Sequence, residues 1–231
     1  MTVKINYSNK SKDNAKASTV LFVDDKFNTK ILKKFLANNE LNYINDLLKN
    51  SDLKKNLFVY ELNSKKKIVL ISIKKNLKSS DVENLGAEFF KRINNEKNNE
   101  YYVISDSLSA TQNHFLGHFL HGLKLKSYQF QKYKTKKKIR NISIIVHGSK
   151  NKPTPQEQLK FRALEEGTFF ARDLVSEPGN ILHPDEYAKR LKNLNGDGLK
   201  INIYDDKKLK NLGMYALLGV GQGSVRGSYL V

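Results

Sequence analysis

Short apolar segments rich in β-branched residues alternate with longer amphipathic segments along residues 1–150. The short segments predict six strands: Val3–Tyr7, Thr19–Val23, Leu57–Leu62, Ile68–Ile73, Tyr101–Ser105 and Ile139–Val146. The longer segments predict four helices: Thr29–Ala37, Leu41–Leu48, Ser80–Ile93 and Thr111–Tyr128. Alternation of this kind is typical of an α/β layer structure. A polar stretch joins the third and fourth strands, which predicts a hairpin and therefore a mixed sheet.

A polar, proline-containing stretch, Lys150–Pro155, then interrupts the pattern and marks a domain boundary. Thr154-Pro155-Gln156-Glu157 has the form of a capping box and precedes an amphipathic segment, so one long bridging helix is predicted over Thr154–Ser176. Ala163 and Gly167 lie on one face of this helix at helical spacing. Small residues at these places predict that another backbone packs closely against it.

Shorter elements follow a turn-rich linker, Pro178–Pro184. They are predicted as a helix over Tyr187–Leu194, a strand over Leu199–Tyr204, a helix over Lys207–Leu212 and a final strand over Tyr229–Val231. Glycines are dense between Gly213 and Gly227, which predicts a loop with backbone conformations that side chains disfavour.

The composition narrows the class of protein. The chain has no cysteine, which excludes disulfides, thiolate zinc sites and a cysteine nucleophile. Its apolar runs are shorter than the roughly 20 residues of a membrane-spanning helix, and its first residues lack the pattern of a secretion signal. We therefore expect a cytoplasmic protein that does not associate with membranes.

The net charge of +18 raises the question of a nucleic-acid partner, because clustered cations gain affinity by releasing counterions from phosphate. Only six of the 41 basic residues are arginine, the residue that base-reading and phosphate-clamping surfaces favour. The lysines are spread along the chain, which favours a compositional bias and a solvated surface. A nucleic-acid partner is disfavoured on these grounds.

Three segments carry a resemblance to a known family. Glu166–Pro184 contains Ala-Arg-Asp-Leu followed by Pro-Gly-Asn, and Leu212–Ser224 begins Leu-Gly-Met and ends Gly-Ser. Gly122–Lys134 contains Tyr-Gln-Phe-Gln-Lys-Tyr-Lys and is a weaker match. In this order and spacing they resemble the leucyl aminopeptidase (cytosol aminopeptidase) family, from the end of its N-terminal domain onward. Within residues 1–100 only the pattern of elements is similar.

The resemblance implies a metalloaminopeptidase, that is, a metalloexopeptidase and therefore a hydrolase and a protease. Residues 1–150 would be an N-terminal α/β domain with a macro-like mixed sheet, residues 151–177 a bridging helix, and residues 178–231 the incomplete start of an α/β peptidase domain. The complete protein would release N-terminal amino acids from peptides with two divalent metal ions, manganese or zinc, and would assemble as a hexamer.

The resemblance also implies that the chemistry lies elsewhere. The family's Lys, Asp and Glu metal ligands follow the Gly-Ser run, and no position of this sequence matches one. We therefore assign no catalytic, cofactor-binding or metal-ligating residue, expect no metal ion in this chain, and expect the chain to be inactive alone. One departure lies at His183, where the family has Thr; the weaker cap should cost about 1 kcal/mol at that helix start.

A row of three histidines is the nearest approach to a metal site. His114, His118 and His121 fall at i, i+4 and i+7, and two histidines at i and i+4 can share a zinc ion. Apolar residues flank them, and their own predicted helix carries no carboxylate. The row is therefore interpreted as part of a surface or an interface.

The alternative function is a basic α/β module that binds nucleic acid or a nucleotide. Gly219–Ser224 has the glycine density of a phosphate-binding loop but lacks its lysine. Tyr128, Phe130 and Tyr133 interleave with lysines, as in proteins that stack single-stranded nucleic acid. A scaffold loop explains the first feature better, and a solvated loop whose aromatic residues anchor it to the sheet explains the second.

Overall fold

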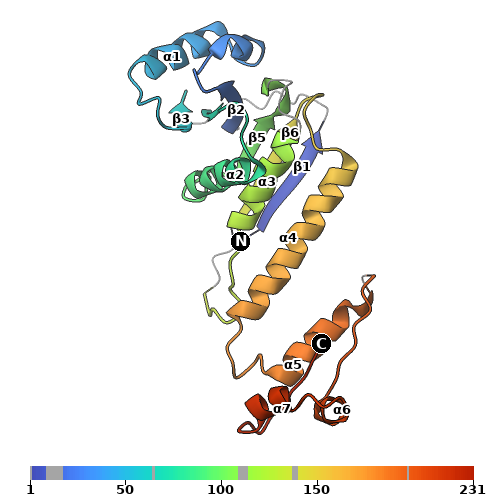
Figure 1. Cartoon of the computed structure of the whole chain (residues 1–231). Helices are drawn as coiled ribbons and strands as arrows, with labels where there is room; N and C mark the ends of the chain where they lie inside the picture. Colours follow the sequence, from blue (N-terminus) through green and yellow to red (C-terminus); the bar gives the residue numbers. More distant parts are fainter. Residues whose placement is uncertain (1, 9–17, 64–65, 109–113, 137–139, 197) are drawn as a thin grey trace. The chain divides into compact units, whose positions relative to one another are not determined.

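The computed structural model describes residues 2–8, 18–63, 66–108, 114–136, 140–196 and 198–231 (Figure 1). The chain divides into two compact units, residues 1–169 and residues 170–231. The first unit contains the sheet. The described residues of the second form short helices and one isolated strand bridge.

The sheet of the first unit has six strands, β1 (Thr2–Ser8), β2 (Ser18–Asp24), β3 (Leu57–Glu61), β4 (Lys67–Ile73), β5 (Glu100–Ile104) and β6 (Asn141–His147). Their order is β1-β6-β5-β2-β4-β3. β3 runs antiparallel to β4, and the other neighbouring pairs are parallel. All six predicted strands are confirmed with small shifts at their ends, although Ile139 lies outside the described residues. The hairpin makes the sheet mixed, so the predicted α/β fold class is confirmed.

Side chains alternate along the central strand β2 and supply two cores. Val20 and Phe22 belong to one core, and Leu21 and Val23 to the other. The short 3-10 helix η1 (Thr29–Lys34) and helix α1 (Asn38–Lys49) cover the second face, whereas α2 (Ser79–Ile93) and α3 (Phe115–Lys126) cover the first. A strand buried on both faces needs apolar residues at successive positions, which is what the run Val20–Val23 provides.

Helices α2 and α3 approach each other at two glycines. A Cβ atom on Gly86 would lie 2.8 Å from the carbonyl carbon of Phe119 and 2.9 Å from the amide nitrogen of Leu123. A Cβ atom on Gly122 would lie 2.5 Å from the Cα atom of Glu83. The obstacles are backbone atoms, so the two helices can pack this closely only because neither position carries a side chain.

Helix α4 (Pro155–Ser176) is the predicted bridging helix, and its start confirms the capping box. Thr154 Oγ1 accepts a hydrogen bond from the Glu157 amide at 3.2 Å, and Glu157 Oε2 accepts one from the Thr154 amide at 2.8 Å. The prediction of a closely packed backbone is wrong among the described residues, because a Cβ atom on Gly167 would have nothing within 4 Å. Helical spacing identifies a face but does not say what lies against it. The division between the two units falls inside α4, after Phe169.

The second unit contains α5 (Pro184–Lys192), the 3-10 turn η3 (Asn193–Gly196), α6 (Asp206–Asn211) and α7 (Tyr215–Gly221). The two predicted helices are present, and the first begins three residues early, at Pro184. The predicted strands Leu199–Tyr204 and Tyr229–Val231 are wrong. Only Tyr204 and Leu230 pair, through N–H···O bonds of 2.8 and 3.0 Å, because the described residues give the rest of each segment no neighbouring strand.

The glycine-rich segment is also different from its prediction. Gly219 and Gly221 lie in α7, a helix that the residues Ala216-Leu217-Leu218 favour. Gly213 does adopt a left-handed conformation, with φ of 72°. Its amide bonds to the Lys210 carbonyl and the next amide to Leu209, which is the Schellman arrangement that ends α6.

Two other helix predictions need correction. Thr29–Ala37 is not an α-helix: Asn28 caps the 3-10 helix η1 by accepting from the Lys30 amide, and the amides of Phe35 and Leu36 both turn back to the Leu32 carbonyl. Helix α3 begins at Phe115, because His114 before it has a left-handed backbone with φ of 64°; the predicted start, Thr111, lies outside the described residues.

Candidate functional site

The histidine row lies between helices rather than around a metal. Each histidine pairs through Nδ1 with a different carboxylate: His118 with Glu83 of α2 at 2.9 Å, and His121 with Glu165 of α4 at 3.3 Å. His114 pairs in the same way with Glu157 of α4. Among the described residues no three histidine, aspartate or glutamate side chains converge as metal ligands. The row therefore connects α3 to both of its helical neighbours.

The sequence could not reveal these partners. Glu83 stands 35 positions before His118, and Glu165 stands 44 positions after His121. The only signal was the spacing of the histidines, which places them on one side of α3. Phe161 of α4 adds to this interface, because its ring lies 5.1 Å from the rings of both His118 and His121.

A hollow of about 370 Å³ lies beside this contact, lined by β1, α3 and α4. Burial raises the pKa of Tyr7 to about 12, and the nearby carboxylate of Glu165 adds to the effect. Burial lowers the pKa of Lys124, whose Nζ donates to the Val3 carbonyl. Tyr7 therefore stays protonated at neutral pH and offers no proton transfer there. The bond from Lys124 attaches α3 to the edge strand β1.

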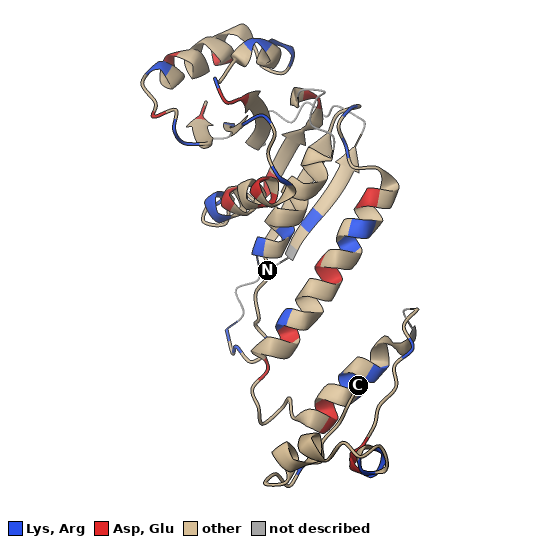
Figure 2. Ribbon diagram, in the orientation of Figure 1, with Lys and Arg blue, Asp and Glu red and all other residues tan. Residues whose placement is uncertain are grey.

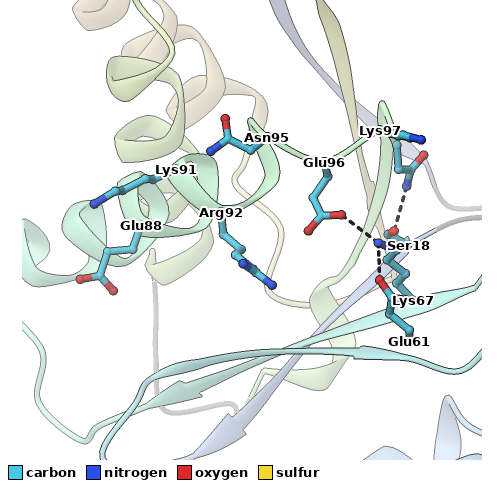
Figure 3. A pocket seen from close by; sticks show the side chains of 10 residues that line it. Ser18, Glu61, Lys67, Glu88, Lys91, Arg92, Asn95, Glu96 and Lys97 are labelled. Carbon is cyan, nitrogen blue, oxygen red and sulfur yellow. Dashed lines mark hydrogen bonds and ion pairs between the residues drawn. The ribbon is translucent and has the colours of Figure 1, made fainter.

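Another hollow, of about 1160 Å³, opens at the amino ends of β2 and β4 (Figure 3). Lys67 lines one side of it, and its Nζ lies 2.7 Å from Glu61 and 2.8 Å from Glu96. Hydrogen bonding to these carboxylates raises the pKa of Lys67, and the bond from Lys67 lowers the pKa of Glu61. Arg92 extends from α2 toward the same space. Because Lys67 is already ion-paired with Glu61 and Glu96, we do not interpret this hollow as a catalytic site.

In the second unit, a polar cluster holds the start of α5. Arg226 Nη1 lies 3.0 Å from His183 Nδ1 and 3.2 Å from Asp185 Oδ2. Burial alone would raise the pKa of Asp185, but its own backbone amide and the side chains of His183 and Arg226 outweigh it and lower that pKa. The His183 side chain accepts no capping hydrogen bond from the first-turn amides of α5, which agrees with the prediction of a weaker cap than Thr.

The structure gives little support to the features that suggested a nucleic-acid or nucleotide partner. Gly219–Gly221 is helical, so it does not form a phosphate-binding loop. Tyr128 packs with its ring centre 5.3 Å from that of Phe169 of α4, so at least one of these aromatic residues contacts a helix. Tyr133 is half exposed, with Lys132 Nζ 5.5 Å from its ring centre. Figure 2 shows acidic and basic residues interspersed along α4. No described helix is long and apolar enough to cross a membrane.

Comparison with known proteins gives a consistent result. Residues 169–231 match the sequence profile of the cytosol aminopeptidase family, catalytic domain. A probable cytosol aminopeptidase of Nitrobacter winogradskyi is 36% identical over 161 residues, which are 67% of this chain and 32% of that protein. One of Phytoplasma mali is 40% identical over 139 residues, 56% of this chain and 27% of that protein. The chain thus spans about a third of the length of these curated relatives.

Solved structures share the fold. A tomato leucine aminopeptidase mutant superposes with a TM-score of 0.71 and 16% identity, over 94% of this chain and 48% of that one. The bottromycin maturation enzyme BotP in complex with Mn gives 0.68 and 15% identity, over 93% and 44%. The resemblance predicted from the motifs is confirmed: this chain is similar to the leucyl aminopeptidases of the cytosol aminopeptidase family, over their N-terminal domain and the start of their catalytic domain.

Proposed function

We propose that this chain is the N-terminal part of a cytoplasmic two-metal aminopeptidase that releases N-terminal amino acids from peptides. The observation that carries the proposal is the match of residues 169–231 to the catalytic domain of the cytosol aminopeptidase family. Residues 1–150 would form the macro-like N-terminal domain, residues 151–177 the bridging helix and residues 178–231 the start of the peptidase domain. The complete protein would assemble as a hexamer.

The metal chemistry would come from outside the described residues. They bring no three metal-ligating side chains together, so they do not fit a site for two divalent ions, whether manganese or zinc. We therefore place no catalytic step on them and propose that the 231-residue chain is inactive alone.

The surface of the second unit supports a role as part of a larger domain. Helix α7 is apolar, yet none of its residues is buried. Tyr215 is 67% exposed and Val220 is 87% exposed. Large exposed apolar surfaces mark interaction sites in soluble proteins. The rest of a peptidase domain is the cover that the family resemblance suggests for α7.

A chimaera tests this proposal. Residues 1–231 would be fused to the part of the Phytoplasma mali relative that follows its matched segment, and hydrolysis of leucine amide would be measured with Mn²⁺. We expect chelator-sensitive turnover by the chimaera and none by residues 1–231 alone. A folded chimaera without turnover would contradict the proposed activity. Turnover by residues 1–231 alone would contradict the proposed inactivity.

A matched variant tests the role of α7. In the isolated chain Val220→Asp should change the free energy of unfolding by no more than about 0.5 kcal/mol, because the side chain is exposed. In the chimaera the same carboxylate would be buried without a partner, and activity should fall steeply. If the chimaera with Val220→Asp were as active as the chimaera without it, the rest of the peptidase domain would not cover α7.

A further inference from the structure

A third hollow, of about 520 Å³, lies at the carboxyl edge of the parallel strands. The end of β2 (Phe22, Val23 and Asp24), the end of β4 at Ile73 and the turn after β5 at Ser107 all contribute to it. Ser107 Oγ accepts a hydrogen bond of 3.0 Å from the Phe22 amide, which holds the turn after β5 against β2. The volume falls in the range of about 300–1,000 Å³ that is usual for small-molecule sites.

The topology makes this edge a place where loops diverge. The chain leaves β2 toward η1 and α1, which pack on one face of the sheet. It leaves β4 toward α2 and β5 toward α3, which pack on the opposite face. Neighbouring loops that turn to opposite faces leave a crevice between them, and ligands of open α/β sheets bind at such a crevice, outside the carboxyl ends of the strands.

The lining combines an apolar floor with a polar rim. Phe22, Ile73 and Leu108 form the floor, and each is buried. Lys30 and Lys75 contribute to the lining from exposed positions in the loops after β2 and β4. An apolar floor with a few polar groups above it is the usual composition of a site for a small organic molecule.

The net charge of the ionised side chains in this lining is positive. Lys30 and Lys75 form no ion pair among the residues that the structure describes. The single carboxylate of the lining, Asp24, is already engaged: its Oδ1 accepts from the amides of Lys26 at 3.1 Å and Asn28 at 2.9 Å. Two ammonium groups against one carboxylate leave this lining with a net positive charge, which favours an anionic ligand.

Left-handed backbone gathers at the same edge. Within the described ranges, the non-glycine residues with positive φ are Phe27, Asn76, His114 and Asn151. They lie in the loops that leave the carboxyl ends of β2, β4, β5 and β6, respectively. Such conformations are costly for residues with a side chain, most of all for a bulky one such as Phe27, and they concentrate at binding sites.

We propose that this hollow binds a small organic anion, with a phosphate or carboxylate group between Lys30 and Lys75 and an apolar body over Phe22, Ile73 and Leu108. The site is separate from the proposed peptidase chemistry and does not depend on it.

The full 231-residue chain would be titrated with phenyl phosphate and with 3-phenylpropionate, which share an aromatic body and differ in the anionic group. Inorganic phosphate and benzyl alcohol would supply the charge and the body separately. We expect at least one of the two aromatic anions to bind saturably. The measurement is the shift of the backbone amide NMR signals at the ends of β2 and β4. Inorganic phosphate alone and benzyl alcohol alone should each bind more weakly than that anion. The preferred probe identifies the anionic group.

Variants separate this site from the general positive charge of the protein. Replacing Lys30 and Lys75 together by Gln should weaken binding about tenfold, since each exposed ion pair contributes modestly. The matched control replaces Lys33 and Lys78 by Gln, exposed lysines of the same two loops that do not line the hollow. An equal loss in both variants, or no saturable binding of either anion, would overturn the proposal.

Discussion

The contact between α2 and α3 gives the sharpest test of the fold. Gly86→Ala would place a methyl group 2.8–2.9 Å from backbone atoms of Phe119 and Leu123, where ordinary contacts begin near 3.4 Å. The Phe119 carbonyl oxygen would lie closer still, so the helices must separate by more than 0.5 Å. No side-chain rotation can relieve the contact, because the atoms in the way belong to the backbone.

The loss of unfolding free energy follows from the packing that this separation of α2 and α3 disrupts. Phe89 and Phe119 are fully buried between these helices and the sheet, with ring centres 5.6 Å apart. A gap of 0.5–1 Å forfeits about a quarter to a half of the dispersion energy of the atoms it separates. Overpacked sites typically lose about 1–3 kcal/mol. The obstacles are backbone atoms, so the loss should lie at the upper end of this range, and alanine recovers up to about 1 kcal/mol of helix propensity. We therefore expect a net loss of about 2 kcal/mol.

Two other glycines provide matched controls. A methyl group at Gly117, in α3, would have the ring of Phe161 as its nearest neighbour at 2.5 Å, and this ring can move. Gly117→Ala should therefore cost less than Gly86→Ala. Gly167→Ala in α4 meets nothing within 4 Å and should stabilise its helix by up to about 1 kcal/mol.

Urea unfolding followed by circular dichroism at 222 nm measures these differences, and the chain has no tryptophan to report by fluorescence. Hydrogen exchange of the α2 and α3 amides would show whether these stability differences arise in the first unit. A Gly86→Ala protein as stable as the original, or a Gly167→Ala protein that loses as much as Gly86→Ala, would refute the reasoning.

Four further outcomes are expected. Arg140→Lys should lower the free energy of unfolding by about 1–2 kcal/mol, and with it the urea midpoint. Arginine reaches the Asn98 carbonyl (2.6 Å) and the Asn99 side chain (2.8 Å) from two different nitrogens, whereas lysine has a single nitrogen. An unchanged midpoint would contradict this. Burial alone would raise the pKa of Glu157, but bonds from Thr154 and His114 outweigh it and lower that pKa, so the folded state gains stability above the unfolded pKa of about 4.3 and loses it as pH falls through the lower folded value. Glu157→Gln should therefore be less stable than the original at pH 7 and equal to it in strong acid, as pH-dependent unfolding would show. Replacing Lys136–Lys138 by Ala should weaken DNA binding no more than replacing three other exposed lysines, in a salt-titrated binding assay. Limited proteolysis should cut first in residues 195–198 or 219–227, and equal hydrogen-exchange protection of residues 199–231 and β6 would contradict that order.

The sequence by itself determined the elements whose signals are local. The capping box at Thr154 and Glu157 fixed the start of α4, and the apolar runs fixed six strands and the hairpin between β3 and β4. The motifs in Glu166–Pro184 and Leu212–Ser224 were sufficient to find the family. These features are local in the chain, because a cap, a turn or a motif needs only residues that are near in sequence.

Only the tertiary structure decided the features that join distant residues. The glycines that bring α2 and α3 together are Gly86 and Gly122, whereas helical spacing had pointed to Gly167 in α4. The segment Leu199–Tyr204 has the composition of a strand but is not one, because a strand requires a neighbour to accept its hydrogen bonds. The hollow beside Lys30 and Lys75 exists because two loops turn to opposite faces of the sheet. That divergence is set by the order of the strands, which no local pattern contains.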